Sequence, residues 1–166
     1  MTVPSEEQWN KIYHIVGFIT ITWAFIERFM DDSILFIYNV FDGKTIPKKI
    51  PKTKLILKIE LLKIYLEQLP KISQYKDNGL RIINTVEEFS SQRHWLVHGA
   101  LIKITPDVLY FTKYKYGQNK HQIENFEHKI TDLDKYAKAL QDITTELSVL
   151  AQNIAEDAML QKHGLQ

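Results

Sequence analysis

Residues 12–26, IYHIVGFITITWAFI, form the most apolar part of this chain and contain no lysine, arginine, aspartate or glutamate. Apolar side chains recur at intervals of seven through this segment and beyond it, at Trp9, Val16, Trp23, Met30 and Ile37. An interval of seven keeps residues on one side of a helix. Ile12, Ile19 and Ile26 add a second row beside the first. A helix that is apolar over this much of its circumference needs cover on more than one side, and a dimer interface is one way to supply it.

This helix has a clear beginning, and its surroundings argue against a membrane segment. Ser5 and Gln8 form a capping box, which predicts a helix over residues 5–39. The uncharged stretch is shorter than the roughly 20 residues that a membrane-spanning helix needs. Glu6 and Glu7 precede it, where an export signal has basic residues. We therefore expect a core helix in a cytoplasmic protein that does not contact a membrane.

The composition is that of an ordinary globular protein. The chain has 166 residues, of which 45% are hydrophobic and 25% are charged, and its formal net charge is +1. This length predicts one domain over residues 1–166 with a substantial core. The absence of cysteine excludes disulfides, cysteine-ligated zinc, iron–sulfur clusters and thiol catalysis. The six glycines are scattered and form no phosphate-binding loop, which argues against a nucleotide-binding α/β fold.

The remaining segments predict a mainly α protein. Apolar periodicity predicts helices over residues 5–39, 53–69, 80–97 and 131–160. A turn signal at residues 77–79 precedes the third helix, and residues 161–166 form a frayed tail. β-Branched and aromatic residues predict a β-hairpin insertion at about residues 100–116, and the polar residues 116–129 are expected to add an irregular strand. We expect a bundle of about four helices with this small insertion before the last helix.

Residues 90–99, SSQRHWLVHG, place an arginine, two histidines and a tryptophan together at the predicted end of the third helix. One interpretation is structural, because cationic side chains interact favourably with the last carbonyl groups of a helix. A second is a metal site, because His94 and His98 are four positions apart and share a helix face. Its third ligand would be a carboxylate, His14, His121 or His128, and no spacing indicates which one.

The third interpretation is cleavage of RNA without metal. In that reaction a base takes the proton of the 2′-hydroxyl, which attacks the adjacent phosphorus, and an acid protonates the leaving 5′-oxygen. Histidine suits the proton transfers because its unperturbed pKa is near 6.5, and the arginine fork suits the charged phosphorane. Five residues of helix separate Arg93 from His98 by roughly 140°. The two side chains therefore converge only at a frayed helix end or across a two-fold axis between two copies.

Arg93, His94 and His98, followed by Gly99 near the end of a helix, resemble the signature of the HEPN superfamily, which has arginine, a polar residue, variable positions and histidine. His94 fills the polar position with a less usual residue. The segment of residues 23–27, WAFIE, is also similar to the aromatic–acidic part of HEPN first helices. The likeness in layout covers roughly residues 5–160, whereas the motif itself covers six.

This resemblance implies a helical bundle that dimerises and places both motifs at the interface. It implies a metal-independent endoribonuclease of toxin–antitoxin, abortive-infection or other antiviral type, which needs no cofactor. By the motif, Arg93 would bind the scissile phosphate, His98 would act as general base or acid, and His94 would orient them or contact RNA. Some members of the superfamily lack activity and act as binding or antitoxin-interacting modules.

Glu27 is a supporting candidate beside the apolar rows of the first helix. A buried carboxylate needs a partner. In the functional interpretation Glu27 pairs with Arg93 or a histidine across the bundle. In the structural one it pairs with Arg28, Lys11 or solvent.

Residues 44–63 contain seven lysines and one acid, Glu60. Such a run is either a solvated face or a surface for a phosphate backbone. In the second case the RNA-binding residues would be Lys48, Lys49, Lys52 and Lys54. Aromatic residues of the predicted hairpin either cover the core or stack on unpaired bases: Tyr110, Phe111, Tyr114 and Tyr116.

The sequence thus favours a homodimeric, cytoplasmic endoribonuclease acting on RNA through Arg93 and His98, with an antitoxin protein as a possible partner. The alternative is a non-catalytic helical module that dimerises or binds a nucleotide or partner, for example within a toxin–antitoxin system. A metal-dependent hydrolase is a third function, and it requires His94 and His98 to meet a carboxylate.

Overall fold

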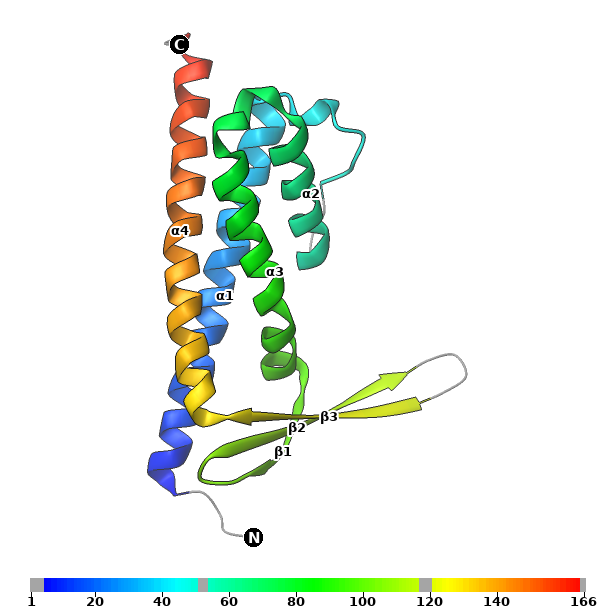
Figure 1. The fold of residues 1–166 in the computed structure, drawn as a ribbon, viewed down its shortest axis with the longest axis vertical. Helices are drawn as coiled ribbons and strands as arrows, with labels where there is room; N and C mark the ends of the chain where they lie inside the picture. Colours follow the sequence, from blue (N-terminus) through cyan, green and yellow to red (C-terminus); the bar gives the residue numbers. More distant parts are fainter. Residues whose placement is uncertain (1–4, 51–53, 117–120, 165–166) are drawn as a thin grey trace. The chain divides into compact units, whose positions relative to one another are not determined.

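The computed structural model describes residues 5–50, 54–116 and 121–164, without the side chains of residues 115, 116 and 121. Its four helices are α1 (Glu6–Val40), α2 (Leu55–Gln68), α3 (Lys76–His98) and α4 (Ile130–Lys162). Its strands are β1 (Ala100–Ile104), β2 (Val108–Tyr116) and β3 (His121–Lys129). Two short 3-10 helices are η1 (Gly43–Thr45) and η2 (Pro70–Tyr75). The predicted fold class is confirmed, because a small antiparallel sheet lies between α3 and the last long helix in the sequence (Figure 1).

The chain divides into two compact units, each built from segments that are distant in the sequence. Unit 1 comprises Met1–Trp23 and Phe89–Gln141, and unit 2 comprises Ala24–Glu88 and Asp142–Gln166. Helices α1, α3 and α4 are each divided between the two units, with one part in unit 1 and the other in unit 2. The predicted capping box belongs to unit 1 and is present. The Ser5 amide donates to the Gln8 side-chain carbonyl at 2.9 Å, and the Gln8 amide donates to the Ser5 hydroxyl at 3.3 Å.

The sheet of unit 1 is larger than the hairpin expected from the sequence. Its strands are antiparallel in the order β1-β2-β3, and β2 pairs with β3 without interruption from Val108 opposite Lys129 to Tyr116 opposite His121. The expectation of an irregular strand over residues 116–129 was therefore wrong. Strand β3 is polar because it is an edge strand whose side chains are mostly exposed, and the ladder to β2 supplies its regularity.

The turn expected at residues 77–79 is instead part of the first turn of α3. Asp77 is favourable there because a carboxylate stabilises the positive end of a helix. Gly79 serves packing: a Cβ atom on it would lie 2.9 Å from both methyl groups of Leu66 in α2. The Asp-Asn-Gly signal was misleading because close contact between two helices also selects glycine.

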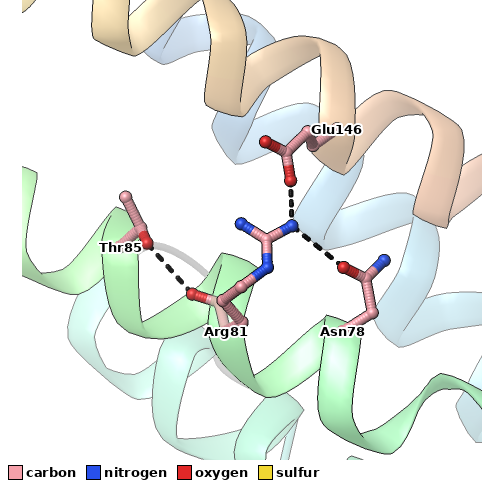
Figure 2. Close-up of polar contacts among 4 residues, drawn as sticks. All are labelled: Asn78, Arg81, Thr85 and Glu146. Carbon is pink, nitrogen blue, oxygen red and sulfur yellow. Dashed lines mark hydrogen bonds and ion pairs between the residues drawn. The ribbon is translucent and has the colours of Figure 1, made fainter.

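Polar side chains join α3 and η2 to α4 within unit 2. Arg81 donates to the Asn78 side-chain carbonyl at 2.9 Å and forms an ion pair with Glu146 of α4 (Figure 2). The Tyr75 hydroxyl donates to the carboxylate of Asp157 at 2.5 Å. Burial and this hydrogen bond raise the pKa of Tyr75 to about 12, so the phenol keeps its proton.

Helix α1 buries one side and leaves the other uncovered by the described residues. Its buried apolar residues are Ile12, Ile15, Ile19, Trp23, Ile26, Met30, Ile34 and Ile37. Tyr13 and Ile21 on the other side are 65% and 61% exposed. By length and composition alone α1 could cross a membrane, and 33% of its most apolar window is buried inside the protein. The core helix of a soluble protein and a signal sequence both meet the same criterion, so it does not distinguish between them.

Gly99 provides a test of how α3 meets the sheet. A Cβ atom on Gly99 would lie 2.5 Å from the Trp95 carbonyl oxygen and 3.2 Å from the Phe111 Cβ atom, so Gly99→Ala forces backbone movement. We expect Gly99→Ala to lower the free energy of unfolding in urea by about 1–3 kcal/mol. The control is Gly17→Ala in α1, where a Cβ atom meets nothing within 4 Å. It should raise stability by roughly 0.5–1 kcal/mol because alanine favours helix. Equal stabilities of the two variants would contradict the packing argument.

Candidate functional site

The motif of Arg93, His94 and His98 occupies the last turns of α3, and β1 begins two residues after the helix. The Gly99 amide donates to the Trp95 carbonyl at 2.8 Å, and Gly99 lies against Phe111 of β2. The end of the helix is therefore packed on the sheet, and residues of β2 lie close to the motif.

His94, His98 and Lys113 form a cluster at this junction. The ring centroids of His94 and His98 are 5.1 Å apart. The ammonium group of Lys113 in β2 contacts Nε2 of His94. His98 is exposed, whereas His94 and Lys113 are half-buried.

Lys113 was not predicted from the sequence as a site residue, because it belongs to no local motif. It is one of two lysines in β2, and only the tertiary fold brings it to His94. Its partner across the sheet is Glu124 of β3.

Arg93 lies on α3 beside the hydroxyl group of Tyr136. That hydroxyl accepts a hydrogen bond from the indole of Trp23 in α1 at 2.9 Å and donates to the carbonyl of Phe89 at 3.0 Å. Burial raises the pKa of Tyr136 to about 12, although the Trp23 hydrogen bond and the Arg93 guanidinium act in the opposite direction. No local motif distinguishes Tyr136 in the sequence, and the structure makes it the polar contact of three helices.

The structure thus brings His94, His98 and Lys113 together, and it places Arg93 beside Tyr136. Helix α3 continues through His98, so its end is not frayed there. Arg93 and His98 therefore remain roughly 140° apart around the helix axis. Of the two arrangements that would let them act on one phosphate, a two-fold axis between copies is the one compatible with an intact helix.

The aromatic and apolar neighbours of the motif are only partly core. Leu96 is buried, and Trp95 stacks on Phe126 of β3 with ring centroids 5.2 Å apart. Val97 is 39% exposed, and most residues of β1 are also exposed. The structural interpretation accounts for His98, which is the basic residue of the last turn of α3, and Trp95 and Leu96 pack on the protein, whereas Val97 is exposed.

His128 is a buried structural histidine among aromatic rings. Its ring lies 4.6 Å from that of Phe126 and 6.1 Å from that of Phe111, both nearly edge-on. Its Nε2 atom has no hydrogen-bond partner among the described residues. Burial lowers the pKa of His128 below the usual 6.5 for histidine.

A metal site is not formed by the part of the chain that the structure describes. Within residues 5–50, 54–116 and 121–164, no group of three or more His, Asp or Glu side chains could hold a metal ion. Of the candidates for a third ligand, His14 is exposed on α1, His128 is enclosed by aromatic rings, and the side chain of His121 lies outside the described set.

Glu27 belongs to unit 2, whereas Arg93, His94 and His98 belong to unit 1. The two cations that the structural interpretation offered to Glu27 bind other carboxylates. Arg28 pairs with Asp32 at 3.8 Å and Lys11 pairs with Asp134 at 3.3 Å. Glu27 itself is half-buried.

The lysines of residues 44–63 are less free than the sequence suggested. Three of them form ion pairs: Lys48 with Glu60 at 3.0 Å, Lys58 with Asp31 at 2.7 Å and Lys63 with Glu87 at 2.6 Å. Asp31 and Glu87 lie outside the counted segment, so a count along the sequence overstates the positive charge. Lys49 and Lys54 are exposed, and Lys52 lies outside the described residues.

The hairpin aromatics divide between the two interpretations. Phe111 is buried, and Tyr110 is half-buried with the Lys103 ammonium 5.1 Å from its ring centroid. Tyr114 is exposed, and the side chain of Tyr116 lies outside the described set. Phe111 therefore covers the core, and the Tyr114 side chain is 54% exposed.

Comparison with known proteins gives a partial similarity. No family model matches the chain, and no solved structure matches it. The chain is 32% identical over 119 residues to probable polyketide synthase 2 of Dictyostelium discoideum. The similarity covers 66% of this chain but 4% of that protein, so it concerns a short segment of a much longer protein and assigns no activity here.

The hydroxyl of Tyr136 should contribute measurably to stability. Tyr136→Phe leaves the buried Trp23 indole and the Phe89 carbonyl without this partner, so we expect the free energy of unfolding to fall by about 1–3 kcal/mol. The control is Tyr65→Phe, because the buried Tyr65 hydroxyl has no hydrogen-bond partner among the described residues. That variant should be at least as stable as the wild type in urea unfolding. A Tyr136→Phe protein of unchanged stability would show that the bridge is energetically neutral.

His128 should make the fold sensitive to acid. Its pKa is lowered in the folded protein, so the unfolded chain binds a proton at this residue more readily, and stability is lost as the pH falls below about 6.5. We expect His128→Leu to show a smaller difference in unfolding free energy between about pH 7.5 and about pH 5 than the wild type. His163→Leu, which replaces an exposed histidine, should keep the full difference. The same pH dependence in all three proteins would count against this role.

Proposed function

We propose that this chain is a cytoplasmic, metal-independent endoribonuclease of HEPN type that works as a homodimer. The observation that carries this proposal is the exposed imidazole of His98 beside the His94–Lys113 contact, five positions after Arg93 at the end of α3. A cluster of imidazole and ammonium groups suits a phosphodiester, because it combines proton transfer with positive charge. Carboxylate-bound metal is not needed for that chemistry.

In the proposed reaction, His98 accepts the proton of the 2′-hydroxyl or donates one to the leaving 5′-oxygen. The 2′-oxygen bonds to phosphorus as the bond to the 5′-oxygen breaks, which leaves a cyclic phosphate. Arg93 stabilises the charge on the phosphorane, and Lys113 contacts His94, which orients its neighbour. Arg93 of one copy and His98 of the other meet across the two-fold axis.

The apolar surface around the motif supports the dimer. Val97 and Leu101 are 39% and 37% exposed, and Ile102 is 61% exposed. These residues flank His98 in the sequence, so a second copy that covered them would bring its own motif to the same place. The uncovered side of α1 offers further apolar area. An antitoxin protein is the proposed partner that would restrain the activity.

A specific observation also favours the non-catalytic alternative. Arg93 lies beside Tyr136, Trp23 and Phe89 within unit 1, which suits a residue that stabilises helix packing. In that case the chain would be a helical module that dimerises or binds a nucleotide or a partner protein.

The test is cleavage of single-stranded RNA by the purified protein in EDTA. We expect the wild type to cleave and His98→Ala to lose at least about 100-fold in rate, because general acid–base catalysis contributes on that scale. His163→Ala, a control at another exposed histidine, should cleave like the wild type. A wild type that leaves RNA intact, or an equally active His98→Ala, would overturn the catalytic proposal.

The same assay tests the dimer when it is combined with molecular mass in solution. Ile102→Glu adds a charge at an exposed position and should yield a folded monomer that does not cleave RNA. A monomeric wild type that still cleaves would show that one copy forms the whole site.

A further inference from the structure

Unit 2 contains a pocket of about 390 Å³ where the end of α1 meets the segment that follows it. The pocket combines an aromatic ring, cations and an apolar wall: Tyr38, Lys44, Lys48, Lys49, Ile46 and Pro47. Its volume lies within the range of small-ligand pockets, about 300–1,000 Å³. This site is separate from the motif of α3, which belongs to unit 1.

The backbone beside the pocket forms a tight turn after α1. Asp42 adopts a left-handed conformation with φ of 63°, and Gly43 follows it. A Cβ atom on Gly43 would lie 2.7 Å from the Tyr38 Cα atom, so the chain folds back tightly onto the last turns of α1. The Thr45 amide and hydroxyl both donate to the Asp42 carbonyl, at 2.9 Å and 2.7 Å. The lysines after this turn are thereby directed to the same place as Tyr38.

The charges around the pocket favour an anion. Asp42 is engaged by Lys71 at 2.8 Å, and this ammonium lowers the pKa of the Asp42 carboxyl. Lys48 is paired with Glu60. Across the described ranges, neither Lys44 nor Lys49 has a carboxylate within ion-pair distance, so two ammonium groups of the pocket remain for a ligand.

We propose that this pocket binds one unpaired nucleotide of an RNA strand. Lys44 and Lys49 bind its phosphate, and the base lies against Tyr38 and the apolar wall. A pocket with both ammonium groups and an aromatic ring favours a nucleotide over inorganic phosphate. The base of a nucleotide contacts Tyr38 and the apolar residues, whereas inorganic phosphate contacts only the lysines. The inference rests on the RNA binding of the proposed function. Of the predicted RNA-binding residues Lys48, Lys49, Lys52 and Lys54, the first two line the pocket, and Lys44 and Tyr38 line it as well.

The test is binding of a labelled single-stranded RNA octamer to the full chain, followed by fluorescence anisotropy, with His98→Ala in all proteins to prevent cleavage. We expect Lys44→Ala/Lys49→Ala to weaken binding at least about tenfold and to lower the salt slope of the binding constant by about 0.7, because the two lysines neutralise one phosphate of the single strand. The control is Lys138→Ala/Lys162→Ala, which removes the same charge from exposed positions of α4 and should bind like the parent.

A second comparison separates a nucleotide from a phosphate. Adenosine monophosphate should displace the octamer at lower concentration than inorganic phosphate does, and Tyr38→Leu should remove that difference. Equal weakening by both double variants, or no weakening by either, would overturn the pocket.

The outcomes also separate this inference from the nuclease proposal. If wild-type protein cleaves RNA and Lys44→Ala/Lys49→Ala binds the octamer unchanged, the pocket is wrong and the nuclease stands. If the pocket variants lose binding and wild-type protein cleaves nothing in EDTA, the pocket stands and the catalytic proposal fails.

Discussion

One buried hydroxyl group, that of Tyr136, joins the three helical segments of unit 1. It accepts from Trp23 of α1 and donates to the Phe89 carbonyl of α3, while it belongs to α4. A buried hydroxyl group lowers stability unless it forms hydrogen bonds. The two hydrogen bonds of Tyr136 therefore fix how the three segments pack and also contribute to the free energy of unfolding. The orientation of α3 at this point decides where the motif that follows Phe89 is presented.

Beyond the bridge, α3 carries two kinds of surface. The side with Arg93 faces the Tyr136 hydroxyl, and the other side carries the exposed His98. Strand β2 then adds Lys113 to the histidines. The cluster of His94, His98 and Lys113 is therefore built from a helix and a strand that approach each other closely at Gly99. The candidate site is a property of this junction, since neither element contains it alone.

The sequence predicted the fold class well because the fold rests on periodicity and capping. The capping box at Ser5, the four helices and the first two strands all follow from local patterns. The regular strand β3 was missed because edge strands need few apolar residues, and its order comes from pairing with β2. The glycine at position 79 was misread because helix packing, which is not local, selects the same residue as a turn.

The candidate site was only partly predictable for the same reason. The motif in α3 is a local pattern, so Arg93, His94 and His98 could be named. Lys113 and Tyr136 depend on contacts between distant segments, and the ion pairs of Lys58 and Lys63 involve acids far along the chain. A single sequence carries no record of such contacts.

The alternation of side chains along β2 has a consequence for how this protein could diverge. Thr112 and Tyr114 point to the opposite face of the sheet from Lys113, because successive residues of a strand alternate. Loss or gain of a single residue in the tight connection between β1 and β2 would shift the strand by one position and exchange the two faces. Descendants that differ by one codon in that loop would keep the helical framework yet exchange an ammonium group beside His94 for a hydroxyl or a phenol.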